Sequence, residues 1–145
     1  MVKVYPYAEF DADFPDDQVD EGGHVKFFPG RNVAEAIAEI LRRTGLNPAE
    51  PEHLDVHGWG FHTKFKKHSM WIQLSTSEDA HFYMYTWNSS SFIDRLTKSA
   101  KMIHPEFLIV LSRELNADPR FHGITWFSRD DRNREAGSAK PVDGA

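Results

Sequence analysis

Apolar and polar residues alternate with a period of two through most of residues 54–87, and two short polar breaks interrupt the alternation. This period is typical of β-strands, in which successive side chains point to opposite faces of the sheet. The breaks fall at residues 66–67 and 78–79, and both have the even length of a tight hairpin turn. The pattern therefore predicts three consecutive antiparallel strands.

The two turns also predict how the three strands are aligned. With two residues in each turn, Phe61 faces Ile72 and Ile72 faces Tyr85, which gathers the largest apolar side chains on one face. A face this apolar must be covered, so we expect the helices to pack on it. Its predicted residues are Trp59, Phe61, Met70, Ile72, Leu74, Tyr83, Tyr85 and Trp87.

The opposite face of these strands is predicted to be flatter and more polar. Two of its positions are glycines, which weaken a strand unless a bulge, a sharp twist or the close approach of another group uses the bare backbone. A bulge or twist is the simpler interpretation, and a binding surface is the alternative. The candidate binding surface comprises Gly58, Gly60, Trp71, Gln73, Ser75, Phe82 and Met84.

The remainder of the chain predicts three helices and three further strands. Residues 33–44 give the clearest helix, because apolar residues recur on one face, Asn32 provides an N-cap and Gly45 a stop. The other elements are helices at residues 92–101 and from Pro105 to before Pro119, and strands at residues 2–7, 25–28 and 121–128. Together they predict an α+β fold, with an antiparallel sheet of four to six strands and about three helices on its aromatic face.

Charge and periodicity divide the 145 residues into one domain and two irregular segments. Seven carboxylates and no basic residue occur between Glu9 and Glu21, which predicts an acidic loop over residues 9–23. We interpret it as an arm that docks on a basic partner or on the chain's own Arg95, Lys98 and Lys101. Residues 129–145 lack periodicity and predict a disordered tail, so the α+β domain spans residues 1–128.

Composition excludes several classes of function. The chain has no cysteine, so thiol catalysis and disulfides are excluded, and its net charge of −5 gives no general case for binding nucleic acid. The start of the chain lacks the pattern of a secretory signal, and no apolar run approaches the ~20 residues of a membrane span. We expect a soluble, cytoplasmic protein that needs no cofactor.

The eight histidines suggest two chemical alternatives. His57 and His81 fall in one row of the predicted sheet and are candidate metal ligands, although they lie two strands apart, at about 10 Å. The spacing fixes no third ligand, and Asp55 and Asp79 are only nearby candidates. His62, Lys64 and His68 surround the first hairpin and could supply the acid, base and positive charge for cleaving a phosphodiester. Hydrated histidines and solubilising lysines are the simpler interpretation of both groups.

The leading functional hypothesis is a small, non-enzymatic binding or accessory protein with a protein partner, since no catalytic motif is present. It would use its open sheet face or an edge strand, and an adaptor or immunity-like role fits by analogy. The segment from His122 to Phe127 has no lysine or proline to protect an edge and carries apolar residues on both faces. We expect this strand to pair within its own chain, and therefore a monomer rather than a homodimer.

Overall fold

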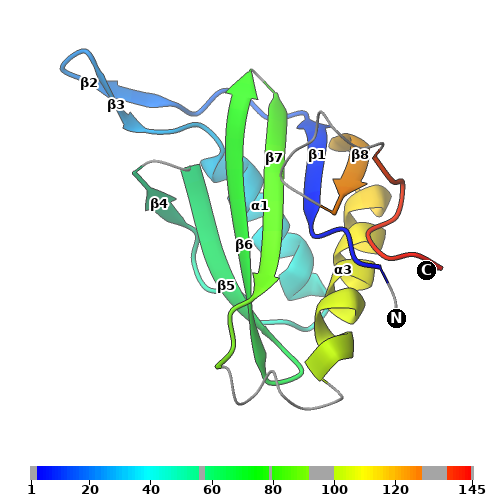
Figure 1. Ribbon diagram of the computed structural model, residues 1–145. Coiled ribbons are helices and arrows are strands. Elements are labelled where there is room, and N and C mark those ends of the chain that lie inside the picture. The colour runs from blue at the N-terminus through cyan, green and yellow to red at the C-terminus, as the bar shows by residue number, and fades with distance from the viewer. Residues whose placement is uncertain (1–2, 56–57, 79, 92–99, 129–136, 145) are drawn as a thin grey trace.

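The protein folds around a six-stranded antiparallel sheet with the strand order β4-β5-β6-β7-β1-β8 (Figure 1). The computed structural model describes residues 3–55, 58–78, 80–91, 100–128 and 137–144. The strands are β1 (Tyr7–Ala12), β4 (Glu52–Leu54), β5 (Gly58–Phe65), β6 (His68–Glu78), β7 (His81–Asn88) and β8 (Phe121–Phe127). The predicted α+β class and antiparallel sheet are confirmed.

Helices α1 (Arg31–Arg43) and α3 (Ala100–Ala117) both lie behind the sheet in the view of Figure 1. The core therefore lies between them and one face of the sheet, and we call the other face the open face. Neither of the two described helices is long and apolar enough to cross a membrane. Fully buried core side chains include Phe10, Ile37, Ile40, Leu41, Phe61, Ile72, Leu74, Phe107, Leu108 and Trp126.

The two-residue turn predicted for the first hairpin is confirmed. Phe61 faces Ile72 and Phe65 faces His68, which leaves Lys66 and Lys67 as the turn. Both lysines have positive φ, at 48° and 71°. This is the conformation of a type I′ turn, whose twist matches that of the flanking strands.

The alignment predicted for the second hairpin is wrong by one residue. Ile72 faces Thr86 rather than Tyr85, and two differences combine to give this register. Glu78, predicted in the turn, pairs with His81 at the end of β6, and a bulge between Thr76 and Glu78 inserts an extra residue into β6. Since side chains alternate with a period of two, this single insertion exchanges the two faces of β7.

The exchange corrects both predicted faces. Phe82 and Met84, predicted on the open face, are 6% and 1% exposed and belong to the core. Tyr83, Tyr85 and Trp87, predicted in the core, lie on the open face, where Tyr85 is opposite Gln73 and Trp87 is opposite Trp71. The helices therefore cover a face of phenylalanine, leucine, isoleucine and methionine side chains, and the tyrosines are on the other side.

Helix α1 confirms the prediction for residues 33–44 but begins at Arg31, and its cap is not Asn32. The backbone N–H groups of Gly30 and Asn32 donate to the two carboxylate oxygens of Asp17, at 2.8 and 2.7 Å. The acidic segment therefore docks on a helix N-terminus through Asp17. Of the predicted basic docking residues, Arg95 and Lys98 lie outside the described residues, and Lys101 is exposed.

The acidic segment is also not a continuous loop. Residues Glu9 and Asp11 lie on β1, which is flanked by β7 and β8, so the predicted N-terminal strand begins at Tyr7 instead of residue 2. Further along, β2 (Val19–Glu21) and β3 (His24–Phe27) form a separate two-stranded sheet that projects from the body in Figure 1. We call residues 19–27 the arm.

Two further elements differ from the predictions. Helix α3 has begun by Ala100, and Pro105 lies inside it rather than in its first turn. The separate helix predicted at residues 92–101 falls mainly on residues 92–99, outside the part of the chain that the structure describes.

Residues 137–144, predicted to belong to a disordered tail, lie against the domain instead. Ser138 and Trp126 exchange backbone hydrogen bonds at the outer edge of β8. Val142 forms a bridge with Val4 and is only 3% exposed. The C-terminal residues therefore contribute to the core.

Candidate functional site

Five aromatic and imidazole rings cross four strands of the open face, and we call them the ring row. His62 lies 4.6 Å from Trp71 between ring centroids, and Trp71 lies 6.4 Å from Trp87. Tyr85 continues the row at 5.2 Å from Trp87, and Tyr7 lies 5.9 Å from Tyr85. The row runs from β5 through β6 and β7 to β1, so strands that are distant in sequence build one surface.

Gln73 fixes the centre of the ring row. Its side-chain carbonyl accepts hydrogen bonds from the indole N–H of Trp71 at 2.9 Å and from the hydroxyl of Tyr85 at 2.7 Å. Gln73 is 7% exposed and Trp71 is 8% exposed, so the bond between them is buried, and the bond from Tyr85 is partly buried. Because one oxygen orients two rings, the middle of the row is rigid.

The two glycines predicted as a binding surface have structural roles. A Cβ atom on Gly60 would lie 2.8 Å from Cη2 of Trp71, so the indole ring rests on bare backbone. Gly58 has a φ of 103°, and a Cβ atom there would collide with the backbone oxygen of Leu74. Of the other predicted surface residues, Trp71, Gln73 and Ser75 lie on the open face, whereas Phe82 and Met84 do not.

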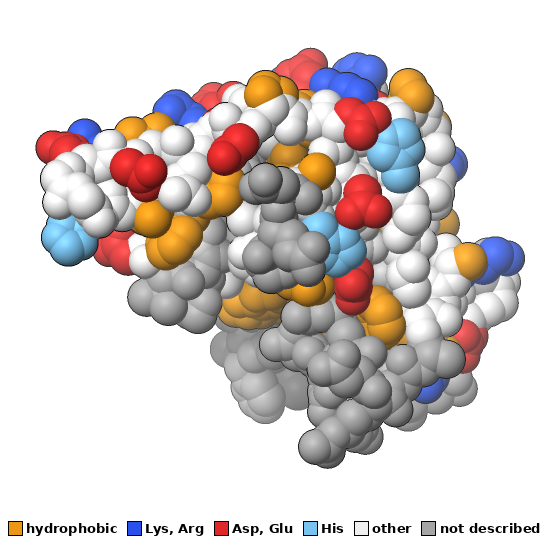
Figure 2. All heavy atoms as spheres, turned by 90° about the horizontal axis from the view of Figure 1, so that it is seen from above, with side chains coloured by type: hydrophobic (Ala, Val, Ile, Leu, Met, Phe, Trp, Pro, Cys, Tyr) orange, Lys and Arg blue, Asp and Glu red, His pale blue; other side chains and the backbone are white. Residues whose placement is uncertain are grey.

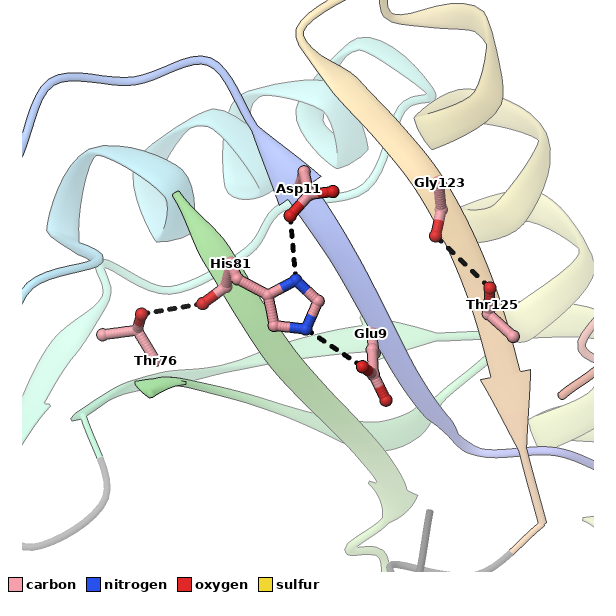
Figure 3. A network of polar contacts seen from close by, with 6 residues as sticks. All are labelled: Glu9, Asp11, Thr76, His81, Gly123 and Thr125. Carbon is pink, nitrogen blue, oxygen red and sulfur yellow. Dashed lines mark hydrogen bonds and ion pairs between the residues drawn. The ribbon is translucent and has the colours of Figure 1, made fainter. Parts of the chain in front are cut away.

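His81 lies between two carboxylates at the β1 side of the open face (Figure 3). Its Nδ1 is 2.8 Å from Oδ1 of Asp11, and its Nε2 is 3.0 Å from Oε1 of Glu9. The hydrogen bond with Asp11 has the largest effect on the pKa of His81 and raises it. Partial burial lowers this pKa, whereas the hydrogen bond with Glu9 and the charges of both carboxylates raise it. The net result is a raised pKa, which favours an imidazolium that donates from both nitrogens.

A second histidine that is bonded to a carboxylate lies beside His81. Nε2 of His122, at the start of β8, is 2.6 Å from Oδ2 of Asp13. Figure 2, which looks onto the end of the sheet at which β7 begins, shows histidine and carboxylate side chains gathered there. We call Glu9, Asp11 and Asp13 the carboxylate strip.

Of the two histidines predicted as metal ligands, the structure describes only His81. His57 lies outside the described residues, and the two nitrogens of His81 are bonded to carboxylates on opposite sides of its ring. Within the described ranges, no group of three or more histidine or carboxylate side chains has a geometry that could hold a metal ion.

The residues predicted to cleave a phosphodiester are divided between the two faces of the sheet. His62 and Lys64 are exposed on the open face. His68 is opposite Phe65 on the other face, and its Nδ1 accepts a hydrogen bond from the amide of Asn88 at 3.2 Å. The three side chains therefore do not surround a common substrate position.

A cavity of about 400 Å³ lies away from the ring row, beside the N-terminus of α1. Its wall includes Phe14, Asp17, Phe28, Asn32 and Thr76, and of the predicted surface residues only Phe82 reaches it. Asp17 already occupies two of the backbone N–H groups at that helix end.

Sequence reasoning missed Tyr7, Glu9, Asp11, Tyr85 and Trp87 as members of this surface. A signal for β7 was present, because Tyr and Trp carry a polar atom that favours a half-exposed position, whereas Phe and Met carry none. Applied to residues 82–87, this rule alone would have placed Phe82 and Met84 in the core.

Comparison of the chain with protein-family models, with curated proteins and with solved structures finds no match in any of the three.

Proposed function

We propose that this chain is a non-enzymatic binding protein and that the open face of its sheet binds a protein partner. The observation that supports this most is the ring row, whose middle ring, Trp87, is 46% exposed. Tryptophan and tyrosine supply much of the binding energy at protein interfaces, because they offer a large contact area for few rotatable bonds.

The ring row is preorganised in the unbound protein. Gln73 holds the rings of Trp71 and Tyr85, and Gly60 lets the indole of Trp71 lie flat. Rings that are already ordered lose little conformational entropy when a partner packs on them. Other exposed apolar side chains in the described part of the chain, such as Met102 and Ile109 on α3, are not joined to such a row.

The open face is a better candidate than either edge strand. The edge strand β4 is only three residues long, and Ala49 further donates a backbone hydrogen bond to the carbonyl of His62 on β5. At the opposite edge, Ser138 pairs with Trp126 of β8. Both edges are therefore short or partly occupied, which discourages pairing with a strand from another chain.

A photo-crosslinking experiment tests the proposal. Benzoylphenylalanine is introduced at Trp87 in one variant and, as a control, at Ile109, which is 38% exposed on α3. In extracts of the native cells, we expect a discrete crosslinked protein from position 87 only. Excess wild-type chain should compete with this product, and the Trp87→Ser chain should not.

Two outcomes would contradict the proposal. Identical products from positions 87 and 109 would show that crosslinking reflects exposure rather than a binding surface. Equal competition by the wild-type chain and the Trp87→Ser chain would show that the ring row does not contribute to binding.

A further inference from the structure

The carboxylate strip and the ring row form one continuous surface. Along β1 and β7, Tyr7 is opposite Tyr85, Glu9 is opposite Tyr83 and Asp11 is opposite His81. Alternate residues of a strand share a face, so Glu9 and Asp11 follow Tyr7 on the open face. A partner that covers the rings therefore reaches the carboxylates within two to four residues of its own extended chain.

His81 shows which kind of group this pair of carboxylates accepts. Its ring is planar and meets Glu9 and Asp11 with one nitrogen each. A guanidinium group is also planar and presents several N–H donors that suit carboxylates. Asp11 remains accessible to such a group, because its side chain is 60% exposed even with His81 bound.

The charges along this surface are unevenly distributed. Among the described residues, the β1 side carries the three carboxylates of the strip, with the imidazoles of His81 and His122 bonded to them. Lys64 is exposed at the far end, near His62 of the ring row. The part of the open face that adjoins Tyr7 and Tyr83 is therefore acidic, which favours a basic partner and opposes nucleic acid, whose phosphates are negative.

We propose that the partner is a protein segment that carries arginine or lysine among apolar side chains. Its apolar part covers the ring row, and its cation binds Glu9 and Asp11 beside Tyr83. This inference rests on the proposed function and specifies the chemistry of the ligand. Arginine suits the site better than lysine, because a guanidinium can bond to carboxylates and stack on an aromatic ring at the same time.

The test uses the full chain labelled with ¹⁵N and four probes. Three are hexapeptides in which leucine alternates with arginine, serine or glutamate, and the fourth is octathymidine, because rings on a sheet can also stack bases. We expect the arginine peptide to shift the indole N–H signals of Trp71 and Trp87 and the amide signals of Glu9 and Asp11. It should bind about 10-fold more tightly than the serine peptide at low salt, and the difference should shrink near 1 M salt.

Two double variants locate the charge that matters. Glu9→Gln with Asp11→Asn should reduce the affinity of the arginine peptide to that of the serine peptide. Asp20→Asn with Glu21→Gln, which removes the same charge from the exposed arm, should leave it unchanged.

The outcomes separate this inference from the proposed function. Equal or tighter binding of the serine or glutamate peptide to the ring row would overturn the basic partner but retain the binding surface. Preferential binding of octathymidine would replace the protein partner by single-stranded nucleic acid. Loss of arginine-peptide binding in the arm variant alone would overturn the inference. The inference would also be overturned if no probe shifted the indole N–H signals of Trp71 and Trp87. The crosslinks from position 87 would then decide the proposed function.

Discussion

At the scale of single residues, the contact between Gly60 and Trp71 determines whether the ring row exists. The indole lies where a Cβ atom of residue 60 would be, and its N–H is bonded to Gln73. A methyl group at position 60 must therefore displace the ring. The same displacement would break the hydrogen bond from Trp71 to Gln73, whose carbonyl oxygen also accepts the hydrogen bond from Tyr85.

We expect Gly60→Ala to destabilise the fold by about 1–3 kcal/mol, which is the usual cost of overpacking a closely filled site. Urea unfolding measures the loss, and the indole N–H signal of Trp71 should move toward that of a solvated indole. The control is a double-mutant cycle with Trp71→Leu, because a smaller side chain leaves room for the methyl group. A strictly additive cycle would show that the cost of Gly60→Ala arises elsewhere.

His104 gives a pH-dependent prediction at the same scale. It lies on α3, its Nε2 is 2.8 Å from the hydroxyl of Thr86, and burial lowers its pKa to about 4 from 6.5. Between these values the unfolded chain binds a proton that the folded chain does not bind, so stability falls as the pH decreases. The difference between these two pKa values corresponds to a loss of stability of at most roughly 3–4 kcal/mol.

The His104→Gln variant should flatten the decline of unfolding free energy between pH 6.5 and 4, because glutamine does not titrate. The matched control is His24→Gln on the exposed arm, which should retain the wild-type slope. His81 contributes in a different range: its raised pKa gives stability that is present below pH 6.5 and is lost as the pH rises through the folded value. An unchanged slope in His104→Gln would exclude His104 as the source of acid sensitivity.

One residue also explains why the candidate surface was only partly predictable. Hydrophobic alternation identified β5, β6 and β7 and the first hairpin turn, because these follow from a local period of two. The bulge between Thr76 and Glu78 is not visible in that period, and it exchanges the two faces of β7. Trp71, Gln73 and Ser75 were therefore placed correctly, whereas Phe82 and Met84 were not.

At the scale of elements, the acidic segment has three distinct structural roles that its composition conceals. Glu9 and Asp11 lie on a strand, Asp17 caps α1, and Asp20 and Glu21 lie on the arm. A run of like charges usually indicates a solvated loop, and only tertiary contacts distinguish these roles. The pairing of β1 with β7 and β8 spans 70 or more residues of sequence, beyond the reach of any local pattern.

The cap of α1 gives the prediction for this scale. Asp17 satisfies two backbone N–H groups at the helix N-terminus and ties the base of the arm to the body. Asp17→Ala should cost about 1–2 kcal/mol, as the loss of a helix cap does, and should speed amide exchange in the arm. Asp16→Ala is the control, because that exposed carboxylate accepts a hydrogen bond from the nearby Gln18 N–H and, within the described ranges, none from α1. Equal effects of the two variants would contradict a specific cap.

The arm itself contains few contacts that could hold it in place. All residues of β2 and β3 are exposed except Phe27, and Val19 and Val25 are each 43% exposed. An isolated two-stranded hairpin is marginally stable in water. The stability of the arm therefore depends on its base. There Asp17 binds α1, and the ring centroids of Phe27 and Trp59 are 6.1 Å apart.

At the scale of the whole molecule, the two ends of the described chain close the fold together. The backbone N–H of Tyr5 donates to the carbonyl of Pro141, and that of Asp143 donates to the carbonyl of Lys3. The hydroxyl of Tyr5 also donates to the carboxylate of Asp143 at 2.9 Å. Residues 137–144 lack the periodicity of a strand or helix, so the sequence alone indicated disorder for a segment that packs through isolated bridges.

Val142 tests whether this closure stabilises the domain. Its side chain is 3% exposed, and Val142→Ala removes two buried methyl groups, so we expect a loss of about 1–3 kcal/mol in unfolding free energy. Val25→Ala makes the same chemical change at a side chain that is 43% exposed on the arm, and it should change stability by less than about 0.5 kcal/mol. Both variants can be compared by urea unfolding at one pH. If Val142→Ala changes the unfolding free energy as little as Val25→Ala does, the C-terminal residues do not belong to the cooperative unit. A clear difference would place the two chain ends, more than 130 residues apart, in one folding domain.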